Sequence, residues 1–96
     1  MLATKISLHR NNALQLLSNA LEKARQVVSR LGENGRTFCG TNAHGQQMLR
    51  ADWDSEEAVI AELNGNLSAQ IRAEEHDIVN LVADPKVTVL LDGLDG

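Results

Sequence analysis

The residues best suited to chemistry lie in one glycine-flanked loop, where Cys39 precedes His44 by five positions. A cysteine acts as a nucleophile when a nearby base holds it as a thiolate, and histidine is such a base. Asn42, between them, would orient the imidazole. No signature of a known cysteine enzyme surrounds the pair, so a packed thiol beside a turn explains Cys39 better. We therefore expect no enzymatic activity and name no catalytic residue.

The same loop offers a second kind of site, for a nucleotide or another anion. Backbone amides at tight turns bind phosphate oxygens, and an arginine adds two parallel hydrogen bonds. The glycine spacing matches neither the phosphate-binding loop of nucleotide hydrolases nor a dinucleotide fingerprint. Our alternative hypothesis is therefore a small-ligand binding or sequestering protein that uses the 35–45 loop at an oligomer seam. Its binding residues would be Arg36, Thr37, Thr41, Asn42 and His44.

Four potential metal ligands follow one another at residues 74–77, as Glu-Glu-His-Asp. Consecutive residues of a helix point in different directions, whereas metal sites on helices use ligands three or four positions apart. We therefore expect no metal and no cofactor, and we expect His76 to be a solvated helix residue. Glu74 or Glu75 falls on an apolar stripe, which predicts a polar contact with Arg25 or Arg30, or with a partner.

The elements that would position these residues follow from hydrophobic periodicity. Polar and apolar residues alternate over 4–9, which predicts a short strand. Apolar residues then recur every three or four positions over 12–31, which predicts an amphipathic helix. Gly32 is expected to end that helix in a left-handed conformation.

A second stripe of apolar residues predicts another helix over 54–83, capped by Asp54 and interrupted at the Asn64-Gly65-Asn66 segment. Asp84-Pro85 would end it, because proline disfavours the α conformation of the preceding residue. The rest of the chain would be a glycine-rich loop (32–51), a strand (86–91) and a polar tail (92–96).

These elements predict a single domain, 1–96, of mainly α (α+β) class: an antiparallel two-helix hairpin with short N- and C-terminal strands. If 36–51 forms a β-hairpin, the order becomes the ferredoxin-like β-α-β-β-α-β. The β-propensity of its arms is mediocre, which favours the helical hairpin.

The helical hairpin has more apolar surface than it can cover by itself. A two-helix layer buries only one of its faces, and the 86–91 strand is apolar on both. We therefore expect a homodimer or higher oligomer, most simply with two-fold symmetry. The side chains expected in the core or dimer interface are Leu14, Leu17, Leu21, Val28, Leu63, Leu67, Ile71 and Ile78.

Charge is divided unevenly along the 96 residues, which carry a net charge of −4. Residues 1–50 hold seven Lys or Arg against two Glu, and residues 51–96 hold two against eleven acidic residues. The overall balance excludes a basic nucleic-acid binder as the default. Antiparallel helices would bring the two signs together, which helps to set their orientation. The residues concerned are Lys23, Arg25 and Arg30 on one helix and Glu62, Glu74 and Glu75 on the other.

The sequence also bears on location and partners. No window approaches the ~18 consecutive apolar residues of a membrane span, and no secretory signal is recognisable. The single cysteine cannot form an internal disulfide. We expect a cytoplasmic protein that binds neither membrane nor nucleic acid.

An acidic half can occupy a basic groove on another protein. Our first hypothesis is therefore a small non-enzymatic interaction or regulatory protein that uses an acidic helical surface against a basic protein partner. Small inhibitors and phage- or plasmid-encoded counter-defence proteins share this size and charge balance, an analogy of composition only. The partner-binding residues would be Glu56, Glu57, Glu62, Glu74 and Glu75.

Overall fold

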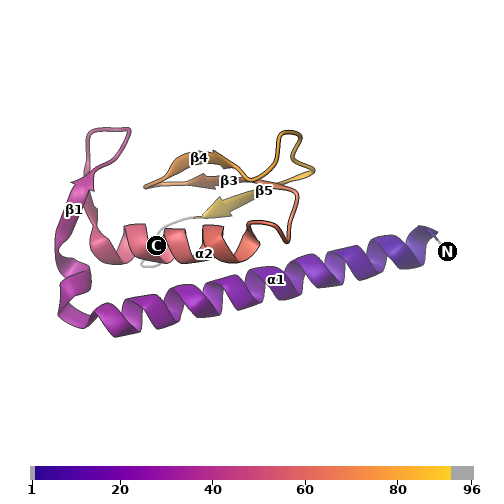
Figure 1. Cartoon of the computed structure of the whole chain (residues 1–96), viewed down its shortest axis with the longest axis horizontal. Helices are drawn as coiled ribbons and strands as arrows, with labels where there is room; N and C mark the ends of the chain where they lie inside the picture. Colours follow the sequence, from indigo (N-terminus) through magenta and orange to yellow (C-terminus); the bar gives the residue numbers. More distant parts are fainter. Residues whose placement is uncertain (1, 92–96) are drawn as a thin grey trace.

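The computed structural model describes the backbone of residues 2–91 and the side chains of residues 13–91, so the predicted tail (92–96) lies outside it. Helix α2 (Arg50–Leu63) runs antiparallel to the longer α1 (Leu2–Leu31) (Figure 1). A 3-10 helix, η1 (Gly32–Arg36), and two strands connect them. The strands of the described chain are β1 (Phe38–Thr41), β2 (Gln47–Leu49), β3 (Ala69–Ala73), β4 (Asp77–Asn80) and β5 (Val87–Leu91).

The predicted two-helix fold is wrong, because the described residues form a mixed α+β fold with two sheets. In one sheet β1 pairs antiparallel with β2, and in the other the order is β4-β3-β5, with β3 antiparallel to β4 and parallel to β5. The ferredoxin-like alternative fits in part, since the 36–51 segment does contain a hairpin. That hairpin, however, stands apart from the three-stranded sheet.

The predicted N-terminal strand is also absent, because residues 4–9 lie within α1. Six alternating residues are a weak signal, and extending an existing helix adds one hydrogen bond for each residue fixed. The other end of α1 is confirmed: Gly32 has a φ of 53°, the left-handed conformation that glycine adopts without strain.

The predicted helix 54–83 is replaced by a shorter helix and two strands. Helix α2 begins at Arg50, directly after β2, so Asp54 lies inside the helix and does not cap it. It ends at Leu63, because Gly65 takes a φ of 83° that no α-helix continues through. Beyond this break the burial of β3 alternates, with Ala69 and Ile71 fully buried and Arg72 exposed. The helical spacing of the apolar residues in this segment was therefore misleading.

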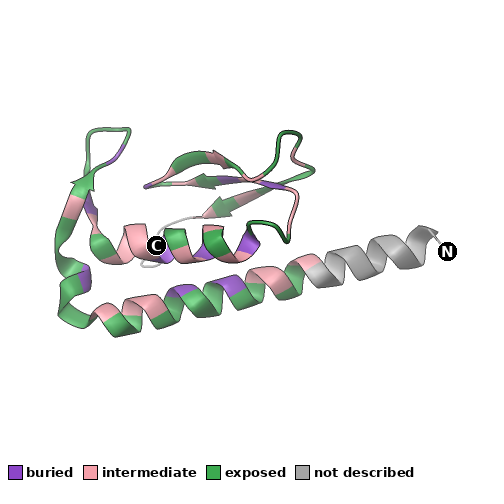
Figure 2. Ribbon diagram, viewed as in Figure 1, coloured by how far each residue is buried: buried purple, intermediate pink, exposed green. Residues whose placement is uncertain are grey.

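The core lies where α1, α2 and the inner face of the three-stranded sheet meet (Figure 2). Small side chains on α1 allow the close approach of α2, and larger ones from α2 and β3 fill the centre. The buried residues of this cluster are Ala20, Ala24, Val59, Leu63, Ala69 and Ile71. Gly35 makes a second close approach: a Cβ there would lie 3.0 Å from the Cβ of Ala51, so η1 can cross the start of α2.

One of the predicted ion pairs between the helices is confirmed. Lys23 Nζ on α1 lies 2.8 Å from Glu62 Oε2 on α2. The lysine side chain is more than half exposed, so the pair contributes ~0–1 kcal/mol to stability and mainly favours this orientation of the helices.

The residues expected in the core or a dimer interface fall into two groups. Leu63 and Ile71 are fully buried, Leu17 and Leu67 pack partly buried against the core, and Val28 is half-buried. Leu14, Leu21 and Ile78 are exposed. Among the described helices, none is long and apolar enough to cross a membrane.

Candidate functional site

The hairpin loop does not form the nucleophile–base pair that its sequence allowed. Cys39 lies in β1 and His44 in the turn beyond it, and no hydrogen bond joins the two in the described chain. Asn42 is buried, and its Oδ1 accepts hydrogen bonds from the backbone N–H groups of His44 and Gln46, each at 3.0 Å. Asn42 therefore orders the turn instead of the imidazole.

The residues of the alternative ligand site do not converge. Arg36 precedes β1 at the base of the hairpin, where it lines a cleft of about 370 Å³ together with Val28, Leu49 and Asp52. Thr41, Asn42 and His44 lie at the opposite end, around the turn. The hydroxyl of Thr37 donates to the carbonyl of Asn34 at 2.7 Å. The cleft beside Arg36 therefore does not include the residues of the turn.

The most connected polar cluster joins the β3–β4 turn to α2. His76 Nδ1 lies 2.8 Å from Glu56 Oε1, and His76 Nε2 lies 2.9 Å from Glu57 Oε1. Each ring nitrogen thus lies within hydrogen-bond distance of a carboxylate oxygen. The indole of Trp53 stacks on the same ring, with centroids 3.6 Å apart and planes 13° from parallel.

Glu56 holds the backbone of that turn as well as its histidine. Its carboxylate accepts hydrogen bonds from the N–H of Glu75 at 3.2 Å and from the N–H of His76 at 3.0 Å. The prediction of a solvated His76 is wrong, because its side chain is only 8% exposed. The tertiary fold packs the histidine between two carboxylates that lie about twenty residues earlier in the chain.

Glu75 is the second buried carboxyl of the cluster. Burial raises its pKa, and the neighbouring charges of Glu56, Glu74 and Asp52 raise it further, while a side-chain hydrogen bond from Asn42 acts against them. Its Oε2 is buried and has no hydrogen-bond partner. Glu75 does face the interior, as its place on the apolar stripe suggested, but its polar contact is Asn42 and not Arg25 or Arg30.

This cluster fastens the β3–β4 turn to α2 through both ring nitrogens of His76. Both nitrogens of His76 are already engaged by carboxylates, so neither is open to a nucleophile or a substrate. In the described part of the chain, no group of three or more His, Cys, Asp or Glu residues is arranged to hold a metal ion. We define the Trp53–Glu56–Glu57–His76 cluster as the turn clamp.

No protein-family model, curated protein or solved structure matches the chain. Function is therefore argued from the chain's own surfaces.

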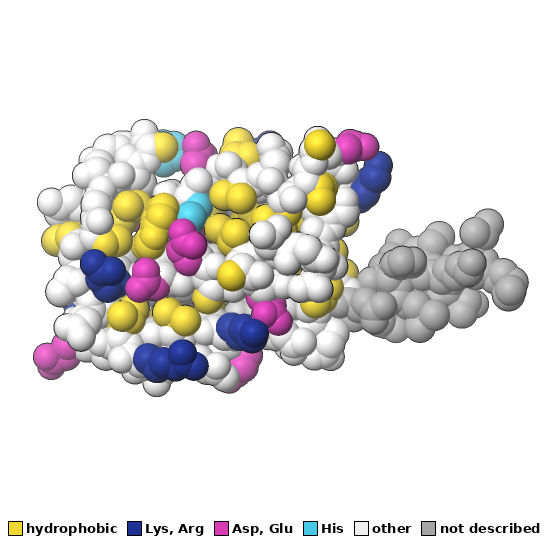
Figure 3. Space-filling model, viewed as in Figure 1, with side chains coloured by type: hydrophobic (Ala, Val, Ile, Leu, Met, Phe, Trp, Pro, Cys, Tyr) yellow, Lys and Arg dark blue, Asp and Glu magenta, His cyan; other side chains and the backbone are white. Residues whose placement is uncertain are grey.

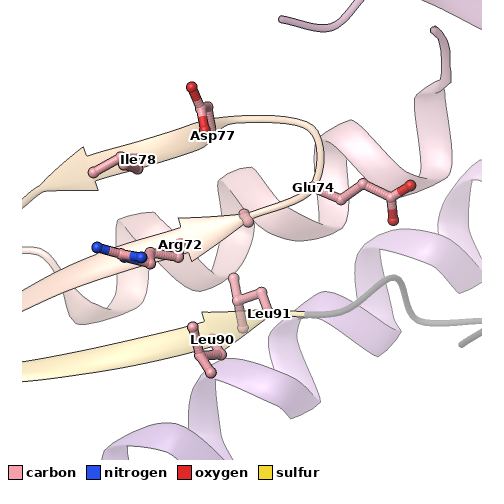
Figure 4. Close-up of a pocket in the computed structure, with 7 residues that line it drawn as sticks. Arg72, Glu74, Asp77, Ile78, Leu90 and Leu91 are labelled. Carbon is pink, nitrogen blue, oxygen red and sulfur yellow. The ribbon is translucent and has the colours of Figure 1, made fainter. Parts of the chain in front are cut away.

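The outer face of the β4-β3-β5 sheet, which points away from the helices, is the most distinctive of these surfaces (Figure 4). At its centre Arg72 on β3 is in register with Ile78 on β4 and Leu90 on β5. Ile78 is 51% exposed and Leu90 is 74% exposed. The three residues line a cleft of about 450 Å³ together with Glu74 and Asp77. We call these five residues the outer-face patch.

Arg72 is held in place by a hydrogen bond, and no counter-charge lies beside it among the described residues. Its Nε donates to Gln70 Oε1 at 3.0 Å, and Gln70 Nε2 donates in turn to Asn80 Oδ1 at 2.9 Å. The guanidinium therefore extends away from the turn that bears Glu74 and Asp77 (Figure 4). Within the described residues Arg72, Glu74 and Asp77 form no ion pair.

The acidic residues expected to bind a partner are mostly engaged within the chain. Glu56 and Glu75 are buried, and Glu62 pairs with Lys23. Glu57 contacts His76 with its side chain 54% exposed, and Glu74 is exposed at the end of the sheet. Figure 3 shows Lys and Arg side chains gathered over α1, with hydrophobic and acidic side chains intermixed over α2 and the sheet. The described structure thus contains no continuous acidic helical surface.

The sequence contained a signal for the outer-face patch. The 87–91 segment carries apolar residues on both of its faces, which predicted that both faces would be covered. One face is, since Val89 and Leu91 pack against the core. The other face presents Leu90 to solvent. The contribution of Arg72 was missed because the sequence pattern placed it in a helix.

Proposed function

We propose that this chain is a small non-enzymatic interaction protein whose outer-face patch binds a segment of another protein. The observation that carries the proposal is Leu90, which is 74% exposed and lies beside Ile78 and an Arg72 that forms no ion pair with any described residue. Arginine is enriched at binding hot spots, and the contacts around a hot spot exclude water from it, a part that Ile78 and Leu90 can take beside Arg72. A single exposed leucine, by contrast, is ordinary. Such a protein acts by occupying its partner's surface, as inhibitors and counter-defence proteins do, and we place it in the cytoplasm.

The chemistry of the patch indicates what it binds. Ile78 and Leu90 offer apolar contacts, and the terminal nitrogens of Arg72 offer paired donors that match a carboxylate. The partner segment should therefore present an acidic side chain flanked by apolar ones. This replaces the basic partner expected from the overall charge, because only Glu57 and Glu74 of the five predicted glutamates are substantially exposed.

A random peptide library displayed on phage tests this proposal without knowledge of the partner. Peptides selected on the chain, immobilised at a density too low for two copies to meet, should be enriched in Asp or Glu beside Leu, Ile, Val or Phe. Synthetic versions should bind at least tenfold more weakly to Leu90→Asp and to Arg72→Glu. Phe38→Asp is the matched control, because Phe38 is 60% exposed on the separate β1–β2 hairpin, and it should bind as the wild type does. An absence of enrichment, or equal loss in the control, would overturn the proposal.

A further inference from the structure

The outer-face patch carries both charges that an interface needs, yet they form no ion pair in the part of the chain that the structure describes. Arg72 lies at its centre, and Glu74 and Asp77 lie at the end of the sheet formed by the β3–β4 turn. The Gln70 side chain holds the guanidinium away from that turn. The positive and negative groups therefore line the same cleft, but within the described residues of one copy they do not pair.

We infer that a second copy of this chain is a partner of the outer-face patch, through a two-fold symmetric packing of sheet on sheet. The inference rests on the proposed function of the same surface. Symmetric dimers bury the same patch from both copies, so the patch must complement itself. An interface with an unpaired arginine and two unpaired carboxylates on one face meets this condition.

The orientation of the two copies follows from charge. A two-fold axis along the strands would place Arg72 of each copy opposite the other's Arg72, with both guanidinium groups pointing the same way. An axis across the strands, along the Ile78–Arg72–Leu90 row, reverses the partner's strand direction. Each guanidinium then extends toward the acidic turn of the other copy, and the like charges separate. We assign this second axis.

The same axis also matches apolar groups. It places Leu90 opposite the partner's Leu90 and Ile78 opposite the partner's Ile78. Each of the two most exposed large hydrophobic side chains of the sheet is then covered by its counterpart in the other copy. Sheets packed face to face interdigitate their side chains at a spacing of ~10 Å, which suits residues of this size. Two Arg72–carboxylate pairs would flank the apolar centre symmetrically.

The test is a charge-exchange experiment in the full chain, read by sedimentation velocity from 1 to 500 μM, with circular dichroism to verify folding. Variant A is Arg72→Glu, and variant B is Glu74→Lys combined with Asp77→Asn. Asparagine is chosen because residue 77 has a φ of 62°, which Asn tolerates. Alone, each variant places like charges across the axis and should be monomeric. Mixed, they restore both opposite-charge contacts and should form a heterodimer.

The wild type should dimerise in this range, Leu90→Asp should be monomeric, and Phe38→Asp should dimerise as the wild type does. A wild type that stays monomeric at 500 μM would overturn the inference, as would a dimer that neither Leu90→Asp nor variant A weakens. Failure of the mixed variants to associate, with a dimeric wild type, would overturn the assigned axis. Peptide binding by a monomeric wild type would preserve the proposed function while removing this inference, so the two failures are distinguishable.

Discussion

Glu56 on α2 holds His76 in the β3–β4 turn: Glu56 Oε1 lies 2.8 Å from His76 Nδ1, and both side chains are more than nine-tenths buried. The same carboxylate accepts the backbone N–H groups of residues 75 and 76. The turn that carries the acidic end of the outer-face patch is thereby fixed to α2. The three predictions below test this arrangement.

Glu56→Gln should destabilise the protein by about 1–3 kcal/mol, because hydrogen bonds from buried N–H groups to a charge are stronger than those to an amide, and the amide also presents a donor to them. Urea unfolding at pH 7, followed by circular dichroism, gives the change in the free energy of unfolding. Glu57→Gln is the matched control, since Glu57 contacts the same imidazole from the exposed side. Its cost should stay below ~1 kcal/mol. Equal costs would show that Glu56 has no special part in holding the turn.

Trp53→Leu should lower stability by more than Trp53→Phe does. Leucine keeps an apolar contact but removes the aromatic face that stacks on His76 at 3.6 Å, whereas phenylalanine retains a ring there. Stacked aromatic pairs contribute about 0.5–1.5 kcal/mol beyond the area they bury. Thermal melts by circular dichroism measure both variants, since neither retains tryptophan fluorescence. A phenylalanine variant no more stable than the leucine variant would contradict the stacking contribution.

Glu75→Gln should stabilise the protein at neutral pH. Burial, and then repulsion from Glu56, raises the pKa of Glu75 above its usual value of 4.5, so the folded state binds more protons than the unfolded state just above that value. The stability contributed by the protonated group is complete below pH 4.5, falls as pH rises through the folded pKa, and stays lost above it. Glutamine cannot ionise, and the variant should lose this part of the pH dependence.

Urea midpoints measured at intervals from pH 4 to pH 8 test the prediction for Glu75. The difference between Glu75→Gln and the wild type should grow with pH and then level off. Glu74→Gln serves as the control, because Glu74 is the exposed neighbour in sequence, and its difference should be small at every pH. A Glu75→Gln variant that is less stable than the wild type at pH 7 would show that ionised Glu75 is favourably placed.

Local patterns were informative where the backbone itself dictates conformation. The apolar repeat up to Leu31 and the left-handed Gly32 were readable, because the period of a helix and the freedom of glycine are properties of neighbouring residues. The β-hairpin proposed for residues 36–51 also depends on neighbouring residues, and the two strands on either side of the turn at Asn42 do pair. The charge division along the chain also predicted the contact between Lys23 and Glu62.

The segment from Leu67 onward shows where local patterns fail. Its apolar residues satisfy a helical spacing, yet Ile71 is in register with Val79 on one side and Val89 on the other, so the segment is extended. Whether this segment becomes a strand or a helix depends on its parallel pairing with β5, and no residue close by in the sequence signals that pairing. Placing His76 in a helix also concealed its contacts with Glu56 and Glu57.

By itself, the sequence determined where α1 ends and that the last strand would be apolar on both faces, but it missed the turn between Ala73 and Asp77. The tertiary structure alone decided that Glu56 and Glu75 are buried and that Arg72, Ile78 and Leu90 share one exposed face. The physical reason is the distance along the sequence over which the interactions act. Turns and helix periods arise from residues within a few positions of one another, whereas burial of a carboxylate and the composition of a sheet face arise from pairing between residues far apart in the chain.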